Sequence, residues 1–242
     1  MNPALSALIA TAALILAACA KTPAQADIDD ARHRAQYARD SMAWQHLKTW
    51  AADGNPAAER ALADALASLD TSDAWRRARP WYERAAGHGD GVSAFRLARL
   101  YAKGSGVAPD RERSRAWLLA AAKLKHPDAA CLLGLHAKNP SSGKPDYAGA
   151  NRWFAQAAEQ GSAEAMFQLG ISYQEGLGVD RDIARARSWY EKAAGLEMPA
   201  ALQTLAMAYR TGDLGLPRND ARSDELFAQA AHAVRDFQSA LF

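Results

Sequence analysis

The chain has 242 residues and a formal net charge of +2, with 29 Lys and Arg against 27 Asp and Glu. This near-balance excludes the strongly basic class of nucleic-acid-binding proteins, and two cysteines exclude a disulfide framework. The 58 alanines, together with few β-branched residues, favour helices that approach one another closely. The composition therefore predicts an all-α protein and argues against an all-β or a parallel α/β fold.

The first stretch of the chain, residues 1–18, carries no charged side chain and is apolar from Ala4 onward. About fifteen apolar residues are too few for a membrane span of about 20, and they suit the core of a signal peptide. The stretch ends in the letters LAAC, closing at Cys19, and this resembles the lipobox of bacterial lipoproteins.

The lipobox resemblance implies cleavage before Cys19, lipidation of its sulfur and a polar tether over residues 19–26. It also implies a place in the cell envelope, lipid-anchored at the periplasmic face of the outer membrane. No Lys or Arg precedes the apolar run, so an ordinary secretory signal or an uncleaved anchor is the alternative.

The rest of the chain repeats a frame every 36 residues. A tryptophan opens the frame, an alanine pair follows it, and a leucine with a small residue directly after it comes next. The members are Trp81, Trp117, Trp153 and Trp189; Ala85-Ala86, Ala121-Ala122, Ala157-Ala158 and Ala193-Ala194; and Leu97, Leu133, Leu169 and Leu205. The spacing of these apolar positions predicts two helices per repeat, and we expect the tryptophans in the core.

Glycines and aspartates mark the ends of the predicted helices. Gly104 and Gly176 follow the first helix of a repeat, where a left-handed residue can end it. Asp110, Asp146 and Asp182 each stand seven residues before a tryptophan. A carboxylate at that place caps the second helix and suits its dipole.

One repeat carries a family pattern almost in full. From Ala165 to Ala194 the sequence runs AMFQLGISYQEGLGVDRDIARARSWYEKAA, which resembles the consensus of the Sel-1-like repeat, a relative of the tetratricopeptide repeat. The resemblance covers about residues 55–235 and implies a right-handed α-solenoid of about six helix pairs. We expect a capping pair over 27–54 and the solenoid over 55–242. Its parts are a degenerate repeat over 55–90, repeats over 91–126, 127–162, 163–198 and 199–235, and a C-terminal cap.

Catalytic and metal-ligating patterns are missing from the sequence. It contains no HExxH, no Walker A motif and no nucleophile elbow, so we expect no metal, no cofactor and no enzymatic activity. Ser141 to Lys144 match the S-x-x-K of penicillin-recognising enzymes, but the partner motifs S-D-N and K-T-G are absent. Cys131, among apolar neighbours, is expected to be a small, half-buried hydrophobic residue.

The remaining surface offers a binding groove. The family resemblance implies that the first helix of each repeat lines a concave face. Two positions recur on the side of that helix away from the second helix, and basic or amide residues flank them. The candidate groove residues are Phe95, Arg99, Lys103, Leu135, Lys138, Phe167, Ile171, Gln174, Met207 and Arg210. Such an apolar stripe suits a peptide or helix of a partner; packing between repeats is the alternative for Phe95 and Phe167.

These inferences favour a lipid-anchored, periplasm-facing scaffold or adaptor that binds a protein or peptide partner and no nucleic acid. Two alternatives stay open. One is an immunity protein that neutralises a periplasm-acting antibacterial effector of the phospholipase type, a role that the resemblance implies for some lipoproteins of this family. The other is an enzyme acting on cell wall or β-lactams, which rests on the S-x-x-K match alone.

Overall fold

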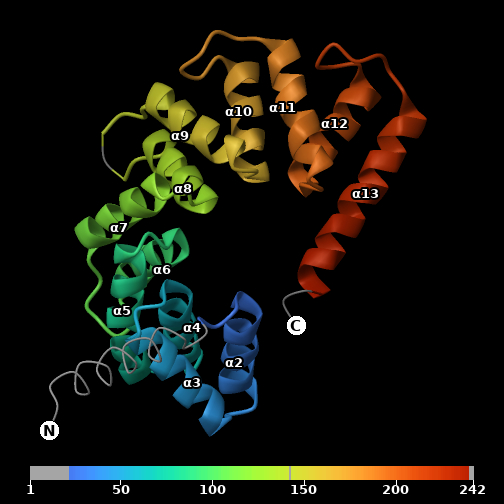
Figure 1. Cartoon of the computed structure of the whole chain (residues 1–242). Helices are drawn as coiled ribbons and strands as arrows, with labels where there is room; N and C mark the ends of the chain where they lie inside the picture. The colour runs from blue at the N-terminus through green and yellow to red at the C-terminus, as the bar shows by residue number, and fades with distance from the viewer. Residues whose placement is uncertain (1–21, 142, 240–242) are drawn as a thin grey trace, which may run out of the picture. The chain divides into compact units, whose positions relative to one another are not determined.

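The computed structural model describes residues 22–141 and 143–239. Over these residues the chain forms twelve helices in six successive pairs and no strand (Figure 1). The helices are α2 (Gln25–Tyr37), α3 (Ser41–Ala52), α4 (Pro56–Ala67), α5 (Ser72–Gly87), α6 (Gly91–Lys103), α7 (Arg111–Lys123), α8 (Pro127–Lys138), α9 (Tyr147–Glu159), α10 (Ala163–Glu175), α11 (Ile183–Gly195), α12 (Pro199–Thr211) and α13 (Asp220–Ser239). The prediction of an all-α fold built from helix pairs is confirmed.

The described residues form two compact units. The first runs up to His88 and includes Ser105–Val107, and the second comprises Gly89–Gly104 and the chain from Ala108 onward. Within the second unit the two helices of each pair pack together, and the second helix of one pair contacts the first helix of the next (Figure 1). Within residues 22–141 and 143–239, no helix is both long and apolar enough to cross a membrane.

The side chains predicted to cap the second helices do so. Asp110, Asp146 and Asp182 accept a hydrogen bond from the backbone nitrogen three residues further on, at 2.9, 2.7 and 2.9 Å. Gly104 and Gly176 end α6 and α10 with φ of +79° and +72°, the left-handed conformation that glycine adopts without steric cost. The helix ends therefore follow directly from the residue types at fixed places in the repeat.

The core of each pair differs from the prediction at one position. The four tryptophans are only half-buried, so their assignment to the core is wrong. The residue after each tryptophan is at most 2% exposed: Tyr82, Leu118, Phe154 and Tyr190. A Cβ atom at Gly134 would lie 2.5 Å from the Phe154 ring, and one at Gly170 would lie 2.5 Å from the Tyr190 ring. The ring that follows the tryptophan thus fills the space that a glycine on the first helix leaves open.

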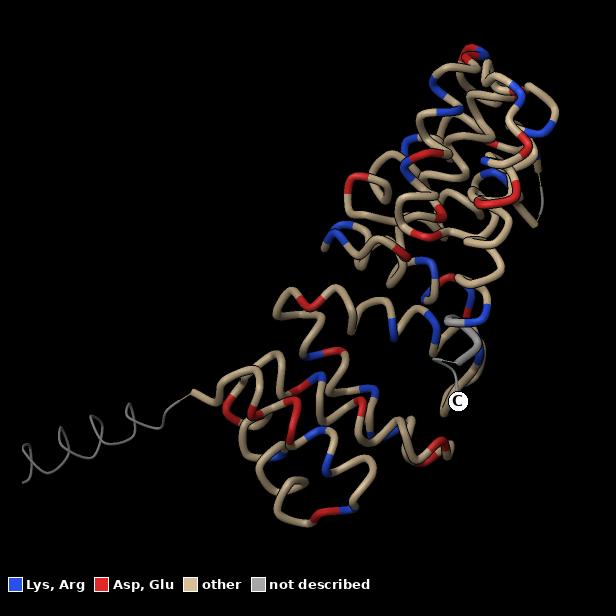
Figure 2. The backbone as a smooth tube through the Cα atoms, turned by 90° about the vertical axis from the view of Figure 1, so that its right-hand side faces the viewer, with Lys and Arg blue, Asp and Glu red and all other residues tan. Residues whose placement is uncertain are grey.

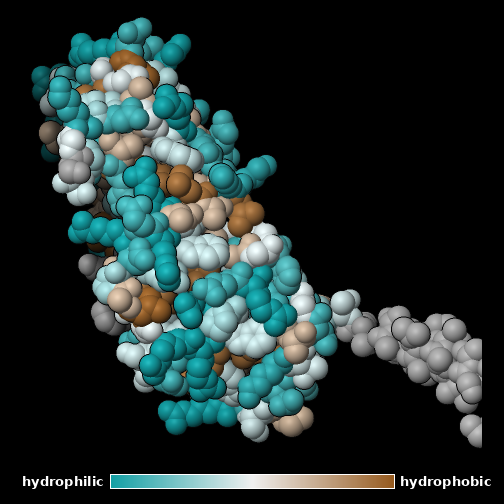
Figure 3. Space-filling model, turned by 90° about the vertical axis from the view of Figure 1, so that its left-hand side faces the viewer, coloured by the Kyte–Doolittle hydropathy of each residue, from teal (hydrophilic) through white to brown (hydrophobic). Residues whose placement is uncertain are grey.

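The interior and the surface of the molecule differ sharply in composition. Among the residues that the structure describes, alanine makes up more than half of the buried apolar ones, which lets the helices approach closely. Lys, Arg, Asp and Glu are interspersed along the chain in Figure 2. The face shown in Figure 3 is mainly hydrophilic, with small, separate apolar patches. A binding site on such a surface has to be sought as a local feature.

In the described part of the first unit, a helix lies where we expected the end of the tether. α2 starts at Gln25, so the last two residues of the range 19–26 are helical. The Asp27 carboxylate accepts a hydrogen bond from the backbone nitrogen of Ala24 at 3.1 Å and closes the first turn. Cys19 and the signal peptide predicted over residues 1–18 lie outside the described residues.

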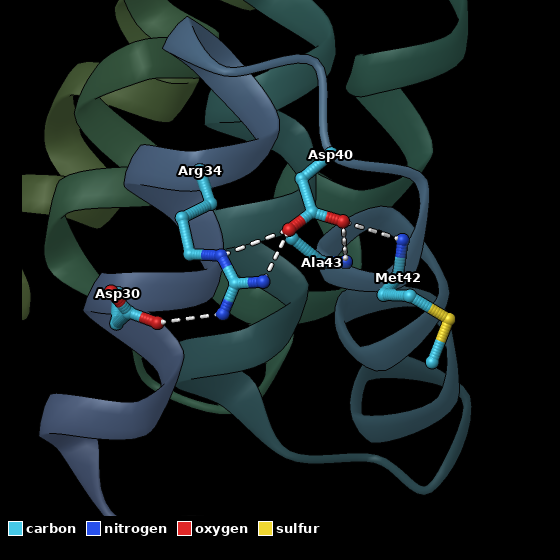
Figure 4. A network of polar contacts seen from close by, with 5 residues as sticks. All are labelled: Asp30, Arg34, Asp40, Met42 and Ala43. Atoms are coloured by element: carbon cyan, nitrogen blue, oxygen red, sulfur yellow. Dashed lines mark hydrogen bonds and ion pairs between the residues drawn. The ribbon is translucent and has the colours of Figure 1, made fainter.

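A network of charged groups holds the turn between α2 and α3 (Figure 4). The Asp40 carboxylate caps α3 by accepting from the backbone nitrogens of Met42 at 2.8 Å and Ala43 at 3.3 Å. Arg34 donates its Nε to Asp40 at 2.9 Å and its Nη1 to Asp30 at 3.4 Å. The hydrogen bonds from Arg34 and from the backbone lower the pKa of Asp40. Because exposed ion pairs add little stability, the network mainly fixes the path of the turn.

Candidate partner-binding groove

The ten candidate groove residues all lie in the second unit, on the first helices of its pairs. They are Phe95, Arg99 and Lys103 on α6, Leu135 and Lys138 on α8, Phe167, Ile171 and Gln174 on α10, and Met207 and Arg210 on α12. Three of them, Phe167, Gln174 and Met207, line one cavity, and the other seven do not.

The cavity lies between α10, α12 and the start of α11 and has a volume of about 660 Å³. Its apolar lining consists of Phe167, Ile183, Ala200, Met207, Ala208 and Leu214, and its polar lining of Gln174, Arg181, Gln203, Thr204 and Asp213. Ligand sites combine apolar walls with a few placed polar groups in this way, at volumes of roughly 300–1,000 Å³. Met207 is 49% exposed, so a large apolar side chain of the lining meets solvent.

The two phenylalanines of the predicted groove are both half-buried. Phe95 stacks on His126, which precedes α8, with ring centroids 4.5 Å apart and an interplanar angle of 20°. Burial lowers the pKa of His126. Phe167 packs against Tyr190 with centroids 5.5 Å apart and also lines the cavity. Phe95 therefore packs between repeats, whereas Phe167 both packs against Tyr190 and lines the cavity.

The corresponding position on α8 is occupied by Cys131, which is 5% exposed and so more deeply buried than we expected. Burial raises the pKa of its thiol to about 11. The thiol is therefore protonated at neutral pH, and the thiolate that nucleophilic chemistry needs is not formed. Leu135 and Ile171, the apolar candidates further along α8 and α10, are half-buried.

A chain of hydrogen bonds joins α8 to α10. Lys138 donates its Nζ to the side-chain oxygen of Gln168 at 2.8 Å, and Gln168 donates its Nε2 to Glu164 at 2.8 Å. Burial lowers the pKa of Lys138. Lys138, expected to flank the groove, is thus half-buried and hydrogen-bonded to the next repeat.

Of the other polar candidates, Gln174 and Arg210 contact other side chains, whereas Arg99 and Lys103 face solvent. Gln174 accepts a hydrogen bond from the Tyr190 hydroxyl at 2.8 Å, and burial raises the pKa of Tyr190 to about 12. Arg210 pairs with Asp224 of its own repeat. Arg99 and Lys103 are exposed on α6.

Eight of the eleven lining residues are not among the ten candidate groove residues. Five of the eight lie on α11 and α12, and three come from the loops before α11 and after α12. Arg181 is exposed and also lines the cavity. Its Nε donates to the backbone carbonyl of Gln174 at 2.9 Å, which holds the side chain there. Asp213 and Leu214 come from the loop after α12. Gln203 stands 36 residues after Phe167, so the repeat frame does signal it.

The described part of the chain holds no group of three or more His, Cys, Asp and Glu side chains suited to a metal ion. Ser141 and Lys144 are exposed. Glu59 of α4 is fully buried in the first unit. Its two oxygens lie 2.9 Å from Arg84 Nη2 and 2.9 Å from His88 Nδ1. Those two contacts tie α4 to the end of α5, so Glu59 belongs to the packing of the first unit.

Comparison with known proteins identifies the repeat. The family model described as Sel1 repeat matches residues 76–90, 91–126, 127–162, 163–197 and 199–233. No curated protein matches the chain. The structure is similar to that of a Sel1 repeat protein from Oxalobacter formigenes, with 25% identity, a TM-score of 0.72, and coverage of 85% of this chain and 82% of that one.

A second similar structure is a protective antigen of uropathogenic Escherichia coli that displays an SLR fold. The identity is 26% and the TM-score 0.60, with coverage of 78% of this chain and 48% of that one. This chain thus spans about half of the antigen. The likeness to both structures confirms the predicted α-solenoid. Sel1 repeats generally mediate protein–protein interaction. Because the matched repeats span more than half of its length, the chain belongs to the Sel1 repeat family.

Proposed function

We propose that this protein is a periplasm-facing lipoprotein, anchored through Cys19, that acts as a non-enzymatic scaffold or adaptor. It binds a protein partner along the first helices of the second unit, α6, α8, α10 and α12. The observation that carries the proposal is the open cavity between α10 and α12, at predicted groove positions of a fold whose repeats generally mediate protein–protein interaction.

Two further observations support a binding role. The groove carries half-buried apolar residues and the exposed Met207, which give a partner apolar surface to cover. Cations on α6, Arg99 and Lys103, are exposed and can meet acidic groups of a partner. The protonated, buried thiol of Cys131 fits a scaffold rather than a thiol enzyme.

Affinity capture from envelope extract tests the binding role. The bait is the mature chain beginning at Cys19, compared with Leu135→Asp and Met207→Asp, which place a charge in the groove. Leu124→Asp is the matched control, because Leu124 is 38% exposed just after α7 and is not one of the ten candidate groove residues. We expect partner bands that both groove variants lose and the control keeps. Bands that all three variants retain would place the binding surface elsewhere.

Metabolic labelling with palmitate tests the anchor. The wild-type chain should incorporate label and fractionate with membranes, whereas Cys19→Ser should do neither. Cys131→Ser is the control, since it removes the chain's other cysteine and should leave labelling unchanged. Equal labelling of wild type and Cys19→Ser would contradict the lipoprotein assignment.

A further inference from the structure

The two gaps on either side of α10 hold different side chains at equivalent places. In the gap between α8 and α10, Lys138 of α8 is hydrogen-bonded to Gln168 of α10, and Gln168 is hydrogen-bonded to Glu164 of its own helix. We call these three side chains the bridge. One period of 36 residues later, Gln168 becomes Thr204 and Glu164 becomes Ala200. These shorter side chains cannot repeat the bridge.

The gap between α10 and α12 is open as a consequence. The Thr204 hydroxyl donates to the Ala200 carbonyl of its own helix at 2.8 Å. Gln174, at the place of Lys138, accepts from the Tyr190 hydroxyl instead of reaching α12. Both Ala200 and Thr204 line the cavity of about 660 Å³. The cavity therefore occupies the space that the bridge fills one repeat earlier.

The cavity has one cation whose terminal nitrogens are available. Arg181 uses its Nε on the Gln174 carbonyl, and within residues 22–141 and 143–239 it makes no ion pair with a carboxylate. The adjacent Asp182 is already engaged, capping α11 and pairing with Arg185 at 3.2 Å. A guanidinium fixed at one nitrogen and free at the other two is well prepared to bind a carboxylate.

From these observations we propose that the cavity is the anchor site of the groove, and the inference rests on the proposed binding function. Its occupant is a peptide segment of a partner protein in which an apolar side chain stands next to a carboxylate. The apolar side chain packs between Phe167, Met207 and Leu214, and the carboxylate pairs with Arg181. The amide nitrogen of Gln174 and the side chain of Gln203 are donors for peptide carbonyls.

Fluorescence anisotropy with three labelled, end-blocked heptapeptides tests the anchor site on the mature chain. The first peptide is Gly-Ser-Asp-Leu-Asp-Ser-Gly; the second has Asn for both Asp, and the third has Gly for Leu. We expect the first to bind at least about tenfold more tightly than either of the others. Equal affinities for the three, or no saturable binding of the first up to about 1 mM, would overturn the inference.

Variants locate the binding. Gln174→Lys with Ala200→Glu and Thr204→Gln copies the bridge of the preceding repeat into the cavity, using side chains that the fold already accommodates. It should abolish binding of the first peptide. Arg181→Gln should reduce binding of the first peptide about tenfold and leave the Asn peptide unchanged. Arg115→Gln, an exposed arginine of α7 outside the cavity, is the control. Binding that survives the copied bridge would overturn the inference.

The capture experiment separates this inference from the proposed function. Envelope partners captured by wild type and by the bridge-copying variant alike, but lost in Leu135→Asp, would support the binding groove and contradict the anchor site. If no partner is captured by any form, while the first peptide binds selectively, the anchor site stands and the scaffold role falls.

Discussion

On the side of α10 that faces α8, a hydrogen bond between side chains joins the two helices; on the side that faces α12, the gap between the helices contains a cavity. The gap between α8 and α10 is crossed by Lys138 and Gln168 and holds the buried Cys131. The gap between α10 and α12 has Phe167 at the place of Cys131 and Thr204 at the place of Gln168. The difference shows that a repeat frame fixes the backbone and the core, while a few exchanged groove residues decide where a site opens.

The largest expected effect concerns the core contact that the pairs α8/α9 and α10/α11 share. Gly134→Ala and Gly170→Ala each place a Cβ 2.5 Å from a buried ring, so each should lower the free energy of unfolding by about 2–3 kcal/mol. Gly195→Ala is the matched control, because nothing lies within 4 Å of its Cβ position. Urea unfolding measures all three. A cost at Gly134 and none at Gly170 would show that the two cores are not equivalent.

A smaller effect is expected from removing the bridge. Glu164→Ala with Gln168→Thr gives α10 the residues that α12 has at these positions, and leaves Lys138 without its partner. We expect a loss of about 1–2 kcal/mol from the broken hydrogen bonds, measured by thermal unfolding, and a second cavity seen in a crystal structure. Glu159→Ala, an exposed change on α9, is the control. Unchanged stability with no new cavity would mean that the bridge does not keep the gap closed.

The buried thiol of Cys131, on α8, predicts that the free energy of unfolding depends on pH. Its pKa is 9.0 ordinarily and about 11 in the fold. The unfolded chain thus loses the proton first as pH rises. The thiol's contribution to stability is full below pH 9 and is lost between about pH 9 and 11. Cys131→Ala should cost about 1 kcal/mol at pH 7 and cost less as pH rises through that window. Unfolding curves of both forms at several pH values measure this, and a constant difference would contradict the burial of the thiol.

The smallest effect concerns the turns that lead into α8 and α12. Lys125 and Glu197 have φ of +61° and +57°, where the turns into α6 and α10 have Gly89 and Gly161 at φ of +92° and +86°. Lys125→Gly and Glu197→Gly should each stabilise the fold by about 0.5–1 kcal/mol, because glycine adopts this conformation without steric cost. Lys123→Gly, in the last turn of α7, is the control and should destabilise. A loss on replacing Lys125 or Glu197 would mean that these side chains make contacts worth more than the strain.

The fold could be predicted from the sequence because its signals are local. The 36-residue frame, the capping aspartates and the glycines at Gly104 and Gly176 determine where helices begin and end. The prediction that Trp189 lies in the core was wrong, because the repeat pattern does not determine which of two adjacent large residues faces the first helix. That choice depends on the space at Gly170, which only the packed pair reveals.

The site could be predicted only in part. Helical phase placed Phe167, Gln174 and Met207 on one face, and all three line the cavity. It could not supply Arg181 and Leu214, because loop residues have no helical phase. Nor could it show that Lys138 is bonded to Gln168, since that contact depends on how far apart neighbouring repeats lie.

Site-specific photo-crosslinking in cells tests most directly whether a partner occupies the gap between α10 and α12. A benzoyl-phenylalanine at position 207 of the full chain should give a discrete protein adduct. The same group at position 124, exposed outside the groove, should give none, and the copied bridge should remove the adduct at 207. An adduct at position 124 alone, or one at 207 that survives the copied bridge, would contradict the account.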